Sequence, residues 1–84
     1  MRKHYHVLVG LRGLYMPDSN DVHRSKRSAI AGARWHADNW NASEDERDEG
    51  DRDKMRRVGP ACYVSKHNII EVTSCNHPDC REDE

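Results

Sequence analysis

Residues 25–40, SKRSAIAGARWHADNW, form the one segment of this chain with a sustained helical pattern. The hydroxyl of Ser25 is suited to cap the N-terminus of a helix, and alanine, the strongest helix former, occurs four times in the next twelve residues. Four apolar residues recur at steps of three or four: Ile30, Ala33, Ala37 and Trp40. This spacing places them on one stripe, which predicts a helix that covers one face of a sheet.

The composition predicts a small protein with a thin core. The chain has 84 residues, of which 35% are hydrophobic and 35% are charged, and it contains no Phe. A single core is only marginally stabilising at this length, so a metal, a disulfide or a partner would add to its stability. The apolar residues fall into clusters rather than being spread evenly, which argues against full disorder.

The segments on either side of the helix predict four strands. Residues 5–11, YHVLVGL, alternate between two faces and are rich in β-branched side chains. A short strand over residues 21–24 precedes the helix, and residues 61–65 and 69–73 form a hairpin around the turn at Lys66 and His67. The order β-β-α-β-β predicts an α+β two-layer sandwich with one helix packed on an antiparallel sheet.

Charge is divided unevenly along the chain, although the net charge is −1. Residues 1–41 carry seven Lys or Arg and three Asp or Glu, whereas residues 42–84 carry seven and twelve. An acidic half and a basic half can attract each other or face different partners. We expect residues 1–84 to form one domain, with an acidic loop or helix extension at 42–54 and a tail containing Cys and His at 74–84.

The acidic run is the main candidate for a partner-binding site. Its carboxylates belong to Glu44, Asp45, Glu46, Asp48, Glu49, Asp51 and Asp53. Closely spaced carboxylates can imitate a phosphate backbone and occupy a groove that normally binds nucleic acid. The alternative is a solvated linker that keeps the chain soluble, and the interleaved Arg47, Arg52 and Lys54 dilute the mimicry.

The cysteines suggest a metal site. Cys75, His77 and Cys80 offer two thiolates and an imidazole within six residues, and Cys62 would complete a tetrahedral zinc set. However, zinc ribbons and fingers usually supply their ligands as two compact pairs, and Cys62 stands alone on a predicted strand. The alternative is that Cys62 is a small buried hydrophobe and that the tail carries ordinary thiols.

Aromatic and basic residues supply two further candidates. Trp35 lies opposite Ala33 and Ala37 on the helix, so it is either an exposed interface anchor, with Tyr15 as a neighbour, or it folds down onto the sheet. Four cations gather around the start of the helix and would bind the phosphates of a nucleic acid: Arg24, Lys26, Arg27 and Arg34. The overall pI of about 6.6 weakens this second interpretation, because nucleic-acid-binding modules are usually basic.

Catalysis and membrane insertion are not expected. The six histidines are scattered, no nucleophile signature surrounds any cysteine, and the chain has little room for a substrate pocket. His4 and His6 share one face of the first strand, where they would be exposed neighbours. No apolar run approaches the roughly 20 residues of a membrane span, and we expect a cytoplasmic protein whose cysteines stay reduced.

The N-terminal half carries a resemblance to known proteins. Residues 5–18, YHVLVGLRGLYMPD, followed by SKRSAI at residues 25–30, resemble small proteins of bacteriophages and mobile elements. The resemblance implies an inhibitor that binds a host complex, as anti-CRISPR proteins do, and some of these present acidic surfaces to DNA-binding grooves. We therefore expect a non-enzymatic inhibitor of a host nucleic-acid-handling complex, such as a CRISPR effector. The alternative is a zinc-stabilised regulator that binds nucleic acid itself.

Overall fold

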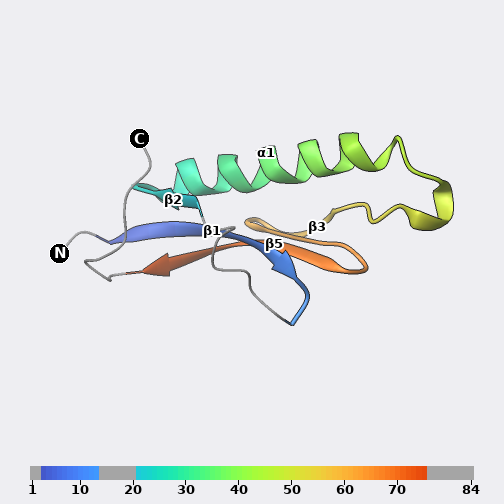
Figure 1. Cartoon of the computed structure of the whole chain (residues 1–84). Coiled ribbons are helices and arrows are strands. Elements are labelled where there is room, and N and C mark those ends of the chain that lie inside the picture. Colours follow the sequence, from blue (N-terminus) through green and yellow to red (C-terminus); the bar gives the residue numbers. More distant parts are fainter. Residues whose placement is uncertain (1–2, 14–20, 76–84) are drawn as a thin grey trace.

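The computed structural model of this protein describes residues 3–13 and 21–75. The elements follow in the order β1 (His4–Leu11), β2 (Asp21–His23), α1 (Lys26–Glu44), the 3-10 turn η2 (Glu49–Asp51), β3 (Arg56–Gly59), β4 (Cys62–Val64) and β5 (Asn68–Cys75). All strands lie in one antiparallel sheet with the order β2-β1-β5-β4-β3. Helix α1 lies across one face of that sheet (Figure 1), so the predicted α+β two-layer architecture is confirmed.

Strand β3 is the element that the sequence did not predict. Within the described residues it is an edge strand whose one partner is β4, and three of its four residues are exposed. A strand with solvent on both faces carries no alternation of apolar and polar residues, so the pattern RRVG gives no strand signal. Its two arginines suit an edge position, because charged side chains discourage pairing with another chain.

The pairing of β1 with β5 sorts the side chains between the two faces. Val7 lies opposite Val72, and Val9 lies opposite Ile70, on the face that the helix covers. The alternate residues point to the other face, where His4 lies opposite Cys75. Val7 and Ile70 are the largest fully buried side chains of the described residues, so the core is as thin as the composition predicts.

Helix α1 is held by packing rather than by its own charges. The Ser25 hydroxyl accepts a hydrogen bond from the Ser28 amide at 3.1 Å, which confirms the predicted cap. The first turn contains no acid and the last turn no base, so side-chain charges do not favour the helix dipole. Ala29, Ala33 and Ala37 are buried against the sheet, where their small side chains allow a close approach. The helix therefore depends on this stripe.

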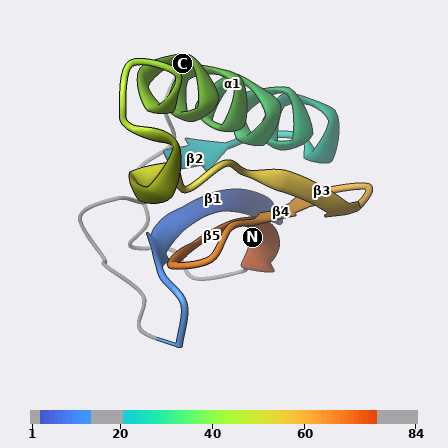
Figure 2. The same cartoon turned by 90° about the vertical axis from the view of Figure 1, so that its right-hand side faces the viewer.

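The helix continues four residues beyond the predicted end at Trp40. Its last residue, Glu44, is buried and extends the alanine stripe at helical spacing. The chain then crosses from the helix layer to the sheet layer before β3 begins (Figure 2). Within the described residues no helix is long and apolar enough to cross a membrane.

Enlarging Ala33 tests the close contact between helix and sheet. Ala33 is fully buried, so Ala33→Leu would overpack the interface and lower the free energy of unfolding by about 1–3 kcal/mol. The matched control is Ala31→Leu on the exposed side of the same helix, for which we expect a change within about 0.5 kcal/mol. Urea unfolding at pH 7 measures both variants. Equal effects would contradict the assignment of the buried stripe.

Candidate functional site

The acidic run separates into buried and exposed carboxylates. Glu44 and Asp53, at its two ends, are only 2% and 5% exposed. Both carboxylates are engaged inside the protein, so they cannot reach the groove of a partner. The prediction that these two residues bind a partner is therefore corrected. A burial pattern of this kind is invisible in a run of similar acids, although Glu44 does continue the helix stripe.

Glu44 joins the end of the helix to the returning chain. Its Oε2 atom accepts a hydrogen bond from the buried Asp53 amide at 2.9 Å, and its Oε1 atom lies 3.3 Å from the Arg47 guanidinium. Without this acceptor the buried Asp53 amide would have no hydrogen bond to replace those it makes with water when unfolded, and the fold would be destabilised. The Glu44 side chain therefore fixes where the chain re-enters the structure nine residues later.

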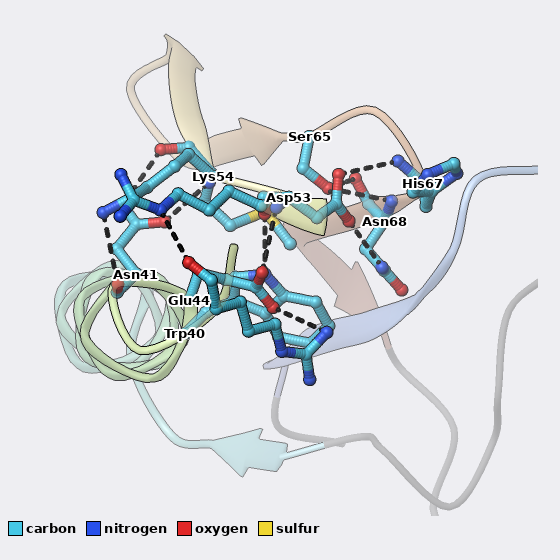
Figure 3. Close-up of polar contacts among 11 residues, drawn as sticks. Trp40, Asn41, Glu44, Asp53, Lys54, Ser65, His67 and Asn68 are labelled. Atoms are coloured by element: carbon cyan, nitrogen blue, oxygen red, sulfur yellow. Dashed lines mark hydrogen bonds and ion pairs between the residues drawn. The ribbon is translucent and has the colours of Figure 1, made fainter. Parts of the chain in front are cut away.

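The Asp53 carboxylate collects three hydrogen bonds from the turn between β4 and β5 (Figure 3). Its Oδ2 atom accepts from the Ser65 hydroxyl at 2.8 Å and from the Asn68 amide group at 2.9 Å. Its Oδ1 atom accepts from the His67 backbone N–H at 3.1 Å. One buried carboxylate thus holds the hairpin turn and the chain that leaves the helix in a single network.

The environment of Asp53 lowers the pKa of its carboxyl group. Burial alone raises the pKa, but the hydrogen bonds from Asn68, Ser65 and the His67 amide favour the ionised form and outweigh it. The charge of the His67 ring acts in the same direction. Asp53 is therefore an ionised structural group at neutral pH.

Two further side chains of α1 bind the backbone of the segment that leads into β3, residues 53–55. The Trp40 indole donates to the Asp53 carbonyl at 2.7 Å. Asn41 pairs with the backbone of Met55, accepting from its amide at 2.7 Å and donating to its carbonyl at 3.1 Å. Met55 is buried in the core, so these contacts link the polar network to the apolar interior.

Between the buried ends lies an exposed acidic turn, which we define as residues 45–51. Backbone hydrogen bonds shape it, from Arg47 to the Glu44 carbonyl at 3.1 Å and from Asp51 to the Asp48 carbonyl at 2.9 Å. Its side chains comprise five acids and one base, and every residue is exposed. The turn is therefore a shaped acidic projection rather than a featureless linker.

The three neighbouring cations, Arg47, Arg52 and Lys54, form contacts within the acidic segment itself. Arg47 pairs with buried Glu44, and the Arg52 guanidinium donates to the Arg47 carbonyl at 3.1 Å. Lys54 pairs with Asp45 and lowers the pKa of that carboxyl through the hydrogen bond and its charge. The remaining carboxylates form no ion pair with any part of the chain that the structure describes: Glu46, Asp48, Glu49 and Asp51. These four acids keep their charge available to a partner.

The other predicted contact residues lie apart from this turn. Trp35 is 61% exposed, so it does not fold onto the sheet, and its ring packs edge-on against His36. Tyr15 lies outside the described residues. The predicted cationic group is exposed just before α1 and along its first half, where Arg34 pairs with Asp38: Arg24, Lys26, Arg27 and Arg34.

The structure regroups the predicted metal ligands. Cys62 lies opposite Glu71 in the pairing of β4 with β5, four residues along β5 from Cys75. That offset corresponds to about 13 Å, which is too far for both sulfurs to bind one metal ion. Cys75 instead lies with His4 and His6, and the donor atoms of the three are within 4.8 Å of one another. His77 and Cys80 lie outside the described residues.

The sequence did not identify a cationic pocket beside the network. A pocket of about 390 Å³ is lined by Val64, Ser65 and four cations from three separate segments: Arg12, Lys54, Arg56 and Lys66. The Arg12 guanidinium donates to the Ser65 carbonyl at 3.3 Å, which anchors it at the hairpin turn. Because these cations are dispersed in sequence, no charge run marks the pocket.

Comparison with protein-family models, with curated proteins and with solved structures gives no match to this chain. The candidate site is therefore interpreted from its own geometry and chemistry.

Replacing Asp53 tests the buried network. Asp53→Asn places an amide where three donors converge, so we expect the free energy of unfolding to fall by about 2–3 kcal/mol at pH 7. Because the folded pKa lies below the unfolded value of about 3.9, the carboxylate stabilises the fold above that pH and loses its effect as pH falls through the folded pKa. The difference between wild type and variant should therefore shrink below about pH 4.

Urea unfolding measured from about pH 2.5 to about pH 7, a range that includes the titration of the Asp53 carboxyl group, gives this difference in the free energy of unfolding. The matched control is Asp51→Asn in the exposed turn, which should change the free energy of unfolding by less than about 0.5 kcal/mol. A wild-type advantage over Asp53→Asn that does not diminish in acid would contradict the assigned role of the ionised carboxylate.

Proposed function

We propose that this protein is a non-enzymatic binding protein that blocks a nucleic-acid-handling complex through its acidic turn. The partner surface is a cationic groove that normally holds a phosphate backbone. On the resemblance of the N-terminal half, the partner is a host complex in the cytoplasm, with CRISPR effectors as the first class to test. The protein would act on them in the manner of a phage anti-CRISPR protein.

The observation that carries this proposal is the set of four unpaired carboxylates on a preorganised turn. Glu46, Asp48, Glu49 and Asp51 are exposed, while the three nearby cations are engaged within the segment. Binding by a turn that already has its shape avoids the entropic cost of ordering a flexible linker. A group of fixed negative charges is attracted to the same surfaces that attract DNA.

Trp35 supports the proposal as an apolar anchor. It is the most exposed large hydrophobic side chain of the described residues, at 61%. It lies nine residues before the end of α1, which corresponds to about 14 Å along the helix axis. A partner that contacts the acidic turn and extends along the helix would therefore also reach Trp35, and exposed Trp residues often supply much of the affinity of an interface.

Neutralising the acidic turn tests the proposal. The immobilised chain is incubated with a panel of purified, guide-loaded CRISPR effectors, and capture is measured against added target DNA and rising NaCl. We expect wild type to capture an effector, and we expect DNA and salt to compete with it. The variant Glu46→Gln, Asp48→Asn, Glu49→Gln, Asp51→Asn should bind at least about tenfold more weakly, because four charge contacts are lost.

The matched control removes the same number of charges elsewhere. It combines Asp38→Asn, Glu82→Gln, Asp83→Asn and Glu84→Gln, and it should retain capture. Equal loss in both variants would indicate attraction by net charge alone and would contradict the assigned site. Equal capture by wild type and the acidic-turn variant would also contradict it, and would move the interface to the helix surface around Trp35.

A second candidate function is direct binding of nucleic acid. The cationic pocket of Arg12, Lys54, Arg56 and Lys66 favours it, together with the exposed cations of the first half of α1. Salt-dependent binding of the isolated chain to DNA or RNA, with no capture of any effector, would select this function. It would be abolished by charge reversal in the pocket and unaffected by neutralising the acidic turn.

A further inference from the structure

Three metal-binding side chains meet where β1 begins and β5 ends. His4 and His6 are alternate residues of β1 and therefore share one face of the sheet, away from the helix. Cys75 lies directly opposite His4 in the antiparallel pairing. The two imidazole rings are 5.1 Å apart, and the donor atoms of all three residues lie within 4.8 Å of one another.

The histidines of this group have buried nitrogen atoms without a bonding partner. His4 is only 4% exposed, although sequence analysis placed it among exposed neighbours. Its Nε2 atom and the Nδ1 atom of His6 are both inaccessible to solvent, and neither has a hydrogen-bond partner in the described part of the chain. Buried polar atoms are normally satisfied, and an orphaned atom at a cluster of ligand side chains indicates a missing ligand.

We propose that His4, His6 and Cys75 bind one Zn²⁺ ion. Imidazole nitrogen and thiolate sulfur are the donors that zinc prefers in proteins, and the ion would satisfy the orphaned nitrogens. In tetrahedral coordination, bonds of about 2.0–2.3 Å place ligand atoms roughly 3.3–3.8 Å apart. Side-chain adjustments of about 1 Å therefore close the observed group around the ion, without a change in strand register.

The proposed site has three protein ligands and one further position. Water can fill that position. The metal would tie the first residue of β1, an inner strand, to the last residue of β5, the central strand of the sheet. Such a link would add stability to a chain whose core is small.

Metal titration of the reduced, metal-free full chain tests the proposal. Zn²⁺ is titrated in competition with a chromophoric chelator, and Co²⁺ is followed by absorption. We expect one equivalent of each ion to bind, with the sulfur-to-cobalt charge-transfer band of a thiolate ligand. Zinc should also raise the unfolding midpoint, whereas Mg²⁺, which prefers oxygen ligands, should not. Absence of stoichiometric binding would overturn the proposal.

Variants identify the ligands. His4→Gln, His6→Gln and Cys75→Ser should each lower zinc affinity at least about tenfold, since each removes a direct ligand. The matched control is Cys62→Ser, which removes a thiol on the same face of the sheet and should leave affinity unchanged. Loss of binding in Cys62→Ser, with retention in His4→Gln and His6→Gln, would overturn the proposal in favour of the ligand set predicted from sequence.

A measurement on wild type guards against variants that fail to fold. In nitrogen-15 NMR spectra, one equivalent of Zn²⁺ should shift the imidazole resonances of His4 and His6 and leave that of the exposed His67 in place. Unchanged His4 and His6 resonances in zinc-saturated protein would overturn the proposal. These readouts do not involve the acidic turn, so they are independent of the test of the proposed function.

Discussion

The hydrogen bonds that converge on the carboxylate of Asp53 are the constraint on which the rest of this structure depends. The chain must leave the end of α1, cross to the other layer and enter an exposed edge strand that has little apolar surface of its own. Asp53 meets this requirement by binding the β4–β5 turn through its side chain while its own amide is bound by Glu44. Each buried charge in this network is satisfied by hydrogen bonds, which is the condition under which buried charges are tolerated.

The same network gives the acidic segment its shape. Because its two ends are fixed in the interior, the intervening turn projects its carboxylates from a defined position rather than from a mobile linker. The cations of the segment support the turn through contacts with Glu44, Asp45 and the Arg47 carbonyl. Acids that look alike in the sequence thus have two different roles. The buried acids hold the turn in place, and the exposed acids give its surface a negative electrostatic potential.

The sequence predicted the elements that have a strong periodic pattern of apolar residues. It did not predict the features that depend on contacts between residues far apart in the chain. The alanine stripe, the Ser25 cap and the alternation of residues 5–11 predicted the helix, its start and the inner strand β1. The sequence left open whether a helix or a loop follows Trp40, because Asn41 and Glu44 are held by partners nine or more residues away. The burial of Asp53 has no local signal. The group of His4, His6 and Cys75 depends on strand register, which no pattern along one strand reveals.

Amide hydrogen exchange at Asp53 tests the central claim most directly. The Asp53 amide donates to buried Glu44 and the His67 amide donates to Asp53, although neither residue belongs to a helix or strand. If the network holds the structure together, both amides should open only in the unfolding that exposes the core, and should exchange as slowly as the Val72 amide of β5. Exchange of both at the rate of an unstructured peptide, with Val72 still protected, would contradict the account.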